Sequence, residues 1–271
     1  MKHFMAKIGI FDSGAGGLSV LKEIIRILPD EEYVYFSDNA YCPYGRKPAE
    51  AIVGRCREIT SLLLSRGCQI ITVACNTATA ASIGILREEF SPVKFIGMEP
   101  AIKSAALSTE TGVVGVLATA GTLKASKYLN TKELVADGIR VVEHVGEGFV
   151  ELVECGKADS PEALEVVRAS VIPMLEEGVD RIVLGCTHYP FLSDAIRKVI
   201  DEFGGSRGHR EVKIIDPAPA VARQLAKVME QENIRTGNTS FRIELLASGS
   251  DELLKRLWKS IETEKQVMNS R

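Results

Sequence analysis

Two cysteines, Cys75 and Cys186, lie in short motifs of matching character, ACNT at 74–77 and GCTH at 185–188. Each cysteine directly follows an apolar run and precedes small polar residues and a segment with helical character. A cysteine at the carboxyl end of a buried strand and beside a helix N-terminus lies where the helix dipole and main-chain N–H groups favour a thiolate. Two such thiols facing one pocket would supply the opposed acid and base groups that inversion of a carbon centre requires.

A glycine-rich turn, DSGAGG at 12–17, follows the first apolar run of the chain. It matches neither the dinucleotide motif GxGxxG nor the phosphate motif GxxxxGK[ST], so a nucleotide site would rest on its glycines alone. Two other interpretations stay open: a tight strand-to-helix turn in which glycine relieves crowding, or a site for a small polar ligand. In such a site Ser13 would donate through its hydroxyl, and Asp12 would bind an ammonium group or assist a base.

Further polar residues follow expected strands, and each has a structural and a functional interpretation. The segment PYG at 43–45 indicates either a turn or a ligand-binding loop in which Gly45 lets main-chain N–H groups approach an anion. Helix capping or ligand binding would suit Asn76, Thr77, Thr119, Thr122 and Thr187. His188 is either a structural histidine or a group that tunes Cys186. As half of a metal pair it would need ligands that no nearby motif supplies.

The elements that must position these residues follow from the hydrophobic pattern, in which short β-branched runs alternate with amphipathic stretches. Strands are expected at 7–11, 33–36, 69–74, 93–98, 113–117, 139–145, 181–184, 212–215 and 241–247, with helices between most of them. This alternation predicts an α/β protein with mostly parallel sheets flanked by helices. Ligands of such sheets bind beyond the carboxyl ends of the strands, where the candidate residues fall.

An internal repeat indicates two similar domains. The run IGIFDSG at 8–14 resembles VGVLATA at 114–120, the two cysteine motifs resemble each other, and FIGMEPA at 95–101 resembles IIDPA at 214–218. Repeats at such long separation indicate related domains rather than a solenoid.

We place the domain boundaries at the two acid-Pro-Ala segments, because proline ends a strand. The expected domains are residues 1–98 with 215–271, to which the chain returns, and residues 99–214. Related by a pseudo-twofold axis and facing each other, they would bring Cys75 and Cys186 to opposite walls of one active-site cleft.

The composition limits the class of protein. A chain of 271 residues with 45% hydrophobic and 25% charged residues suits one large or two medium globular domains. A net charge of −3, with no apolar run of membrane length, predicts neither a nucleic-acid nor a membrane partner. Six scattered cysteines without zinc spacing predict a reduced, cytoplasmic protein that has no disulfide framework and binds no metal. The chain begins by leading into a strand rather than into a signal peptide.

Together the motifs resemble those of the glutamate racemase family, within the aspartate/glutamate racemases. They are DSGxGGLxV at 12–20, PYG at 43–45, ACNTA at 74–78 and GCTHYP at 185–190, in the family's order. The resemblance implies cofactor-independent interconversion of L- and D-glutamate, which supplies D-glutamate for bacterial peptidoglycan. It also implies two similar α/β domains with the active site between them, glutamate as substrate, and a homodimer.

Carried over residue by residue, the resemblance implies that Cys75 and Cys186 are the two acid/base thiols, assisted by Asp12 and His188. It implies that substrate is bound by a set of residues at the strand ends: Asp12, Ser13, Tyr44, Gly45, Asn76, Thr77, Thr119, Thr122, Thr187 and His188. Glu154 is implied as an accessory acid near His188. The chain departs from the family's usual residues at 41–42 and matches it loosely at 144–149.

The chemistry that the residues permit agrees with this resemblance. Without an electron-sink cofactor, an α-carbanion must be stabilised by many N–H and O–H donors around the carboxylate, and the strand ends are rich in such donors. Two alternatives stay open: a racemase of aspartate or another amino acid, and a non-catalytic protein that binds an amino acid between two α/β lobes. Exchange of the α-proton in D₂O distinguishes an enzyme from a binder.

Overall fold

The computed structural model describes residues 7–207, 211–234 and 241–269, so the predicted entry from residues 1–6 into the first strand lies outside the described part. The chain divides into two compact units, residues 1–98 with 218–271 and residues 99–217. The return to the first unit falls a few residues after the expected boundary at 215. The reason is that residues 213–215 form a strand that pairs within the second unit.

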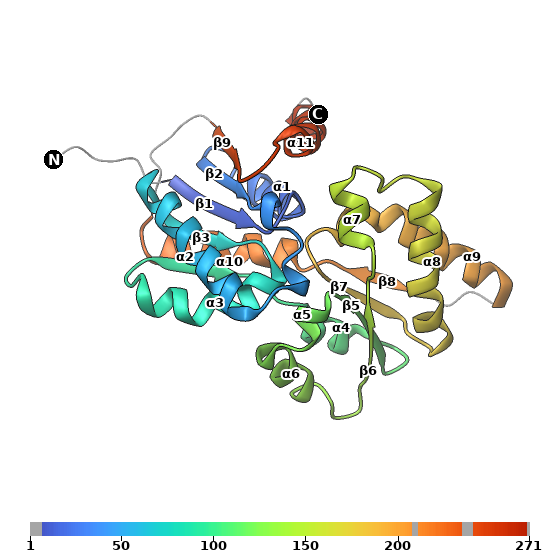
Figure 1. The fold of residues 1–271 in the computed structure, drawn as a ribbon. Coiled ribbons are helices and arrows are strands. Elements are labelled where there is room, and N and C mark those ends of the chain that lie inside the picture. Colours follow the sequence, from blue (N-terminus) through green and yellow to red (C-terminus); the bar gives the residue numbers. More distant parts are fainter. Residues whose placement is uncertain (1–6, 208–210, 235–240, 270–271) are drawn as a thin grey trace. The chain divides into compact units, whose positions relative to one another are not determined.

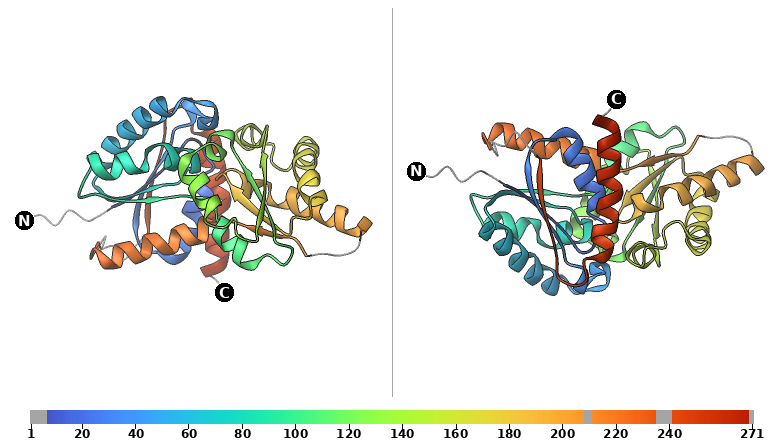
Figure 2. Two further views of the ribbon diagram at one scale, coloured as in Figure 1. Left: turned by 90° about the horizontal axis from the view of Figure 1, so that it is seen from below. Right: turned by 90° about the horizontal axis from the view of Figure 1, so that it is seen from above.

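The first unit contains a parallel sheet of five strands in the order β4-β3-β1-β2-β9. Its strands are β1 (Lys7–Asp12), β2 (Glu32–Ser37), β3 (Cys68–Val73), β4 (Lys94–Gly97) and β9 (Arg242–Ala247). Its helices are α1 (Leu18–Ile27), α2 (Ala49–Ser65), α3 (Asn76–Glu89), α10 (Ala218–Gln231) and α11 (Glu252–Asn269). Helices α2 and α3 pack together on one face of the sheet, while α10 and α11 pack against α1 on the other (Figure 1, Figure 2). The returning segment thus supplies an edge strand and two helices.

The second unit contains a parallel sheet of four strands in the order β6-β5-β7-β8. Its strands are β5 (Val113–Ala118), β6 (Arg140–Val145), β7 (Arg181–Gly185) and β8 (Lys213–Ile215). Its helices are α4 (Ile102–Ser108), α5 (Ala120–Leu123), α6 (Ser126–Glu133), α7 (Phe149–Glu154), α8 (Pro161–Glu176) and α9 (Ser193–Arg207). Three short 3₁₀ turns complete the described chain: η1 (Asn39–Tyr41), η2 (Tyr44–Arg46) and η3 (Tyr189–Leu192).

The strand orders give the internal repeat a structural form. In the first sheet β1, which leads to the glycine turn, lies between β2 and β3, and β3 lies between β1 and β4. The second sheet repeats this with β5 between β6 and β7, and β7 between β5 and β8. Cys75 follows β3 and Cys186 follows β7, so each cysteine leaves the corresponding strand. The predicted α/β class with two similar parallel sheets is confirmed.

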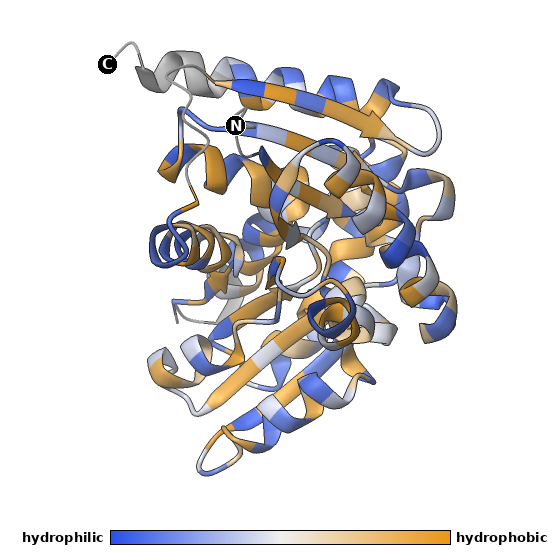
Figure 3. Ribbon diagram, turned by 90° about the vertical axis from the view of Figure 1, so that its left-hand side faces the viewer, coloured by the Kyte–Doolittle hydropathy of each residue, from blue (hydrophilic) through white to orange (hydrophobic). Residues whose placement is uncertain are grey.

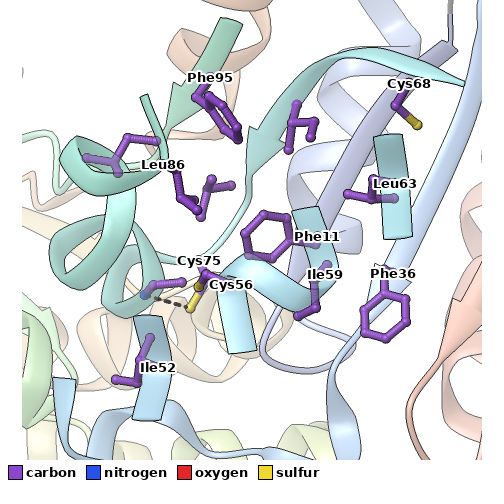
Figure 4. Packing of buried hydrophobic residues seen from close by; sticks show 14 of the residues in the cluster. Phe11, Phe36, Ile52, Cys56, Ile59, Leu63, Cys68, Cys75, Leu86 and Phe95 are labelled. Carbon is purple, nitrogen blue, oxygen red and sulfur yellow. Dashed lines mark hydrogen bonds between the residues drawn. The ribbon is translucent and has the colours of Figure 1, made fainter. Parts of the chain in front are cut away.

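The core of each unit explains why these segments form strands and helices. Side chains of a strand alternate between the two faces of a sheet, and here both faces are covered, so the central strands are nearly all apolar. The helices instead mix hydrophilic and hydrophobic residues (Figure 3). The cluster between the first sheet and α2 and α3 includes Phe11, Ile59, Leu63 and Val73, and Cys75 lies in the same cluster (Figure 4). Of the helices described, none has the length and apolar character to span a bilayer.

A buried carboxylate fastens the amino end of β7 to the segment before β5. Asp180 is only 1% exposed and accepts hydrogen bonds from the hydroxyl of Thr109 at 2.5 Å and the main-chain N–H groups of Glu110 at 2.7 Å and Thr111 at 3.3 Å. It also pairs with Arg181 at 3.2 Å. Burial alone would raise the pKa of Asp180, but these donors and the arginine charge outweigh it and hold the pKa below its ordinary 3.8.

We therefore expect Asp180→Asn to lower the free energy of unfolding by about 2 kcal/mol at neutral pH. The amide N–H groups of the asparagine would face the main-chain N–H groups that now donate to the carboxylate. A carboxyl with a depressed folded-state pKa stabilises the protein above its unfolded pKa, and this stabilisation is lost as the pH falls through the folded pKa. Urea unfolding of the two proteins should therefore show a difference that is full at neutral pH and shrinks below about pH 4. A difference that stays constant as the pH falls well below 4 would contradict this role for Asp180.

Candidate active site

Cys75 is the second of the two residues that join β3 to α3, directly before the helix. Its backbone is extended, and its sulfur accepts a hydrogen bond from the main-chain N–H of Ala78 at 3.4 Å, so the thiol itself caps the helix (Figure 4). The sulfur also lies 3.6 Å from the hydroxyl oxygen of Ser13, within reach of an S–H donor. The thiol is 5% exposed. The sulfur thus faces an N–H group and a helix N-terminus, a geometry that favours negative charge on it.

Asp12 ends β1, and its fully buried carboxylate organises the glycine turn. Its Oδ2 accepts the N–H groups of Gly14 at 3.1 Å and Gly17 at 3.0 Å. The hydroxyl of Tyr35 donates to the carbonyl of Gly14 at 3.1 Å and fixes the turn from β2. Asp12 therefore holds the segment that carries Ser13, and Ser13 reaches Cys75. The sequence predicted the two ends of this arrangement but not Tyr35, since nothing in the pattern of β2 distinguishes that tyrosine from a core residue.

Asn76 and Thr77 begin α3 and are 3% and 6% exposed. In the part of the chain that the structure describes, neither Oδ1 nor Nδ2 of Asn76 has a hydrogen-bond partner. A buried amide without partners is costly, so Asn76 offers a donor and an acceptor to a bound molecule. Thr79, which was not predicted, has a structural role: its hydroxyl bonds the carbonyl of Val73 and the N–H of Met98, fastening α3 to β3 and to the end of β4.

Tyr44 and Gly45 lie in η2, in the segment between β2 and α2. The ring of Tyr44 is 1% exposed and belongs to the same buried cluster as Cys75, and η2 packs against α3. Gly45 is partly exposed. The structure thus brings the PYG segment to the helix that begins after Cys75, together with Asp12, Ser13, Asn76 and Thr77.

In the second unit, Cys186 follows β7 and is 8% exposed. Its sulfur lies 3.7 Å from Nδ1 of His188, and Nε2 of the same ring lies 2.6 Å from Oε1 of Glu154, the last residue of α7. The histidine is almost fully buried, and the Glu154 side chain is 19% exposed. A carboxylate that accepts from Nε2–H leaves Nδ1 toward the sulfur, where it accepts a proton from the thiol or, when protonated, donates to the thiolate. The three groups thus form a continuous chain of contacts from the sulfur to the carboxylate.

The predicted threonines of the second unit divide between two strand ends. Thr119 follows β5 and caps α5: its hydroxyl accepts the N–H of Thr122 at 3.3 Å, and the two hydroxyls lie 3.0 Å apart. Thr187 lies between Cys186 and His188 and is 1% exposed. Because β5 and β7 are neighbours in the sheet, both threonine sets lie at the carboxyl edge with Cys186.

A contact that the sequence did not reveal fastens the element that carries Glu154 to the segment that carries His188. Tyr189, directly after His188, is fully buried, donates its hydroxyl to the carbonyl of Gly146 at 3.4 Å and meets the ring of Phe149 edge-on. A Cβ on Gly146 would lie 2.6 Å from the tyrosine hydroxyl, so only glycine fits there. This contact joins the start of α7, which carries Glu154, to the segment that carries His188. It falls in the stretch 144–149, where the family motif matched only loosely.

The two units thus place candidate acid/base residues at the carboxyl edges of two equivalent parallel sheets, which is the arrangement of a racemase fold. The chain belongs to the Asp/Glu/hydantoin racemase family, whose model matches residues 8–225. It is therefore an isomerase, as its motifs predicted.

The chain is similar to several glutamate racemases. The glutamate racemase of Ectopseudomonas mendocina is 44% identical over 234 residues, 86% of either chain. The crystal structure of glutamate racemase isoform RacE1 from Bacillus anthracis is 30% identical, with a TM-score of 0.83 and coverage of 95% of this chain and 94% of that one. The Escherichia coli glutamate racemase, solved with L-glutamate and the activator UDP-MurNAc-Ala, is 32% identical, with a TM-score of 0.82 and coverage of 94% and 95%.

Proposed function

We propose that this protein interconverts L- and D-glutamate without a cofactor, by a two-base mechanism in which Cys75 and Cys186 are the proton carriers. The observation that carries the proposal is the placement of a buried thiol within two residues after each of two equivalent strands, β3 and β7. A protein that only binds an amino acid has no use for that repetition. The similarity to glutamate racemases over most of the chain supports glutamate as the substrate.

In the proposed reaction one thiolate removes the α-proton, so that an S–H bond forms as the C–H bond breaks. The electron pair is left on the α-carbon and the carboxylate. The opposite thiol then donates its proton to the other face of the carbon, which inverts the centre and leaves a thiolate there. The roles reverse for the other enantiomer. The mechanism needs one thiol on each face of the substrate.

The two thiols have different assistants. Cys75 has the N–H of Ala78, the hydroxyl of Ser13 and the Asp12 turn, whereas Cys186 has the imidazole of His188. Glu154 orients the imidazole and balances its charge after it has taken the thiol proton. The two half-reactions are therefore equivalent in geometry but differ in the groups that assist each thiol.

The negative charge on the carboxylate must be stabilised by donors already in place. We propose that the donors come from short side chains and amides of both units: Ser13, Tyr44, Gly45, Asn76, Thr77, Thr119, Thr122, Thr187 and His188. Asn76 is the clearest member, because its buried amide has no partner among the described residues. We further propose a cytoplasmic homodimer that supplies D-glutamate for peptidoglycan.

The test of the proposal is a panel of single enantiomers of glutamate, aspartate and other amino acids, incubated with the protein in D₂O. Both glutamate enantiomers should racemise and incorporate deuterium at the α-carbon. Polarimetry measures the racemisation, and proton NMR measures the loss of the α-proton signal. The family's description also includes aspartate, so faster turnover of aspartate would reassign the substrate. Tight glutamate binding without α-proton exchange would contradict catalysis altogether.

A further inference from the structure

The segment between β2 and α2 contains a carboxylate that has no solvent exposure, Asp38. Its Oδ2 accepts the hydroxyl of Tyr44 at 2.5 Å and Nε of Arg55 at 3.0 Å, and its Oδ1 accepts Nη2 of Arg55 at 2.6 Å. Burying a charge is costly unless it is paired and hydrogen-bonded. The fork of the arginine and the phenol of the tyrosine meet that requirement together. The ion pair thus has a third member that is not charged.

Each partner of Asp38 is itself held in place. Arg55 comes from α2, and its guanidinium lies 4.0 Å from the ring centre of Tyr41 and also bonds Glu58. The hydrogen bond to Asp38 raises the pKa of Arg55, so it stays cationic. Burial, and then the bond to Asp38, raise the pKa of the Tyr44 phenol well above its usual range, so the phenol stays protonated and donates.

A second anchor holds the beginning of the same segment. The side chain of Asn39 bonds the carbonyl of Ser250 and the N–H of Gly249, and the N–H of Ala40 donates to the hydroxyl of Ser248. These contacts join η1 to the turn that follows β9. These contacts hold the start of the segment, and the buried Tyr44, bonded to Asp38, holds η2 near its far end.

Tyr44 is also the residue whose placement bears on the cysteine. Its ring lies in the buried cluster that contains Cys75, and η2 packs on α3. The position of the ring sets the position of the main chain of Tyr44 and Gly45, the stretch that the proposed function assigns to substrate binding. A displaced ring would move those amides, whereas the hydrogen bonds of the Cys75 sulfur described above involve Ser13 and Ala78.

We propose that Asp38 is a positioning residue of the racemase: it holds Tyr44, and through Tyr44 it places the turn 43–45 for binding the substrate carboxylate. The proposal rests on glutamate racemisation as the function of the chain. Asp38 is fully buried and bonds Tyr44 and Arg55, so its removal should weaken substrate binding more than the chemical steps.

The test compares steady-state kinetics of the wild type, Tyr44→Phe, Asp38→Asn and the double variant, in both directions. Tyr44→Phe keeps the ring in the cluster and deletes only the hydroxyl. We expect KM for both enantiomers to rise by about tenfold with kcat changed less than about threefold, the pattern of a lost binding contribution. Because the two enantiomers are equally stable, kcat/KM must fall by the same factor for L- and D-glutamate.

The double variant tests whether Asp38 acts through Tyr44. The effects of substitutions within one hydrogen-bond network do not add. We therefore expect KM of the double variant to equal that of Asp38→Asn alone. Factors that multiply would overturn the proposal, and so would an unchanged KM in Tyr44→Phe. Arg55→Lys keeps the charge but loses the fork, and we expect an intermediate KM.

Asp180→Asn is the matched control, since Asp180 is a second buried carboxylate with an arginine partner, at the amino end of β7. We expect it to lower the thermal midpoint and to leave KM unchanged. A KM increase as large as that of Tyr44→Phe would show a general effect of stability and overturn the proposal. A wild-type chain that does not racemise glutamate overturns both the function and the role of Asp38, whereas normal wild-type turnover with unaltered variants overturns only the latter.

Discussion

Replacement of Cys75 or Cys186 by serine should lower kcat/KM for glutamate by about a thousandfold, by the same factor for both enantiomers. A serine hydroxyl is a far weaker acid than a thiol, so the substituted side of the substrate loses both its base and its proton donor. The loss should arise without unfolding, because serine is close to cysteine in size. Coupled assay of D-glutamate formation, with circular dichroism as a check on folding, measures both.

Deuterium exchange makes the same variants more informative. In Cys75→Ser the thiol of Cys186 can still remove the α-proton of the enantiomer whose α-proton faces Cys186. It can then return a deuteron to the same face of the α-carbon. Each variant should therefore exchange one enantiomer without inverting it, and the two variants should choose opposite enantiomers. Cys155→Ser, which changes an exposed cysteine, should behave as the wild type. Racemisation at the wild-type rate in either variant, or exchange of the same enantiomer in both, would contradict the two-base assignment.

Gly17→Ala should be the second most damaging substitution. The backbone of Gly17 is in the ordinary helical region, with φ −60°, so alanine is excluded only by lack of space. Its Cβ would lie 2.6 Å from Cβ of Asp12 and 2.8 Å from the hydroxyl of Tyr35, and both neighbours are fully buried. Asp12 must then shift, and with it the turn that carries Ser13. We expect a loss of about a hundredfold in kcat/KM and about 1–3 kcal/mol of stability.

The matched control is Gly54→Ala in α2, where an added Cβ meets nothing within 4 Å. In a helix interior this change should stabilise the protein by about 0.5–1 kcal/mol and leave turnover unchanged. Thermal unfolding and initial rates measured in parallel separate the two glycines. If Gly17→Ala turned over glutamate normally, Asp12 and the glycine turn would not contribute to the reaction as proposed.

Most of the fold could be predicted because buried parallel strands and their covering helices leave strong patterns in the sequence. The expected strand at 33–36 is β2 (Glu32–Ser37), and the expected strand at 241–247 is β9 (Arg242–Ala247), each within one residue at either end. Helix α4 (Ile102–Ser108) was not predicted. It is seven residues long, and only Ile102 and Ala105 are buried, which is too little for a helical period to show.

The site could be predicted only as far as motifs extend along the chain. Cys75 and Cys186 were found because each follows an apolar run, and the repeat of that pattern is a local property. The pairing of Asp38 with Arg55 joins residues on different elements, and nothing in the sequence singles out this arginine among the basic residues. The steric role of Gly17 depends on a side chain from β2, which the local turn pattern does not contain.

The order in which the chain builds its two units has a consequence for biosynthesis. Residues 99–217 are continuous, so that unit can fold while the rest of the chain is still being made. The unit that contains Cys75 needs residues 242–250. They supply its edge strand β9 and the hydrogen bonds of Gly249 and Ser250 to Asn39. Its sheet can be completed only once residues 242–250 have left the ribosome. The half-site of Cys186 should therefore mature first, and a nascent chain stalled before residue 242 should contain one ordered thiol site and one open sheet edge.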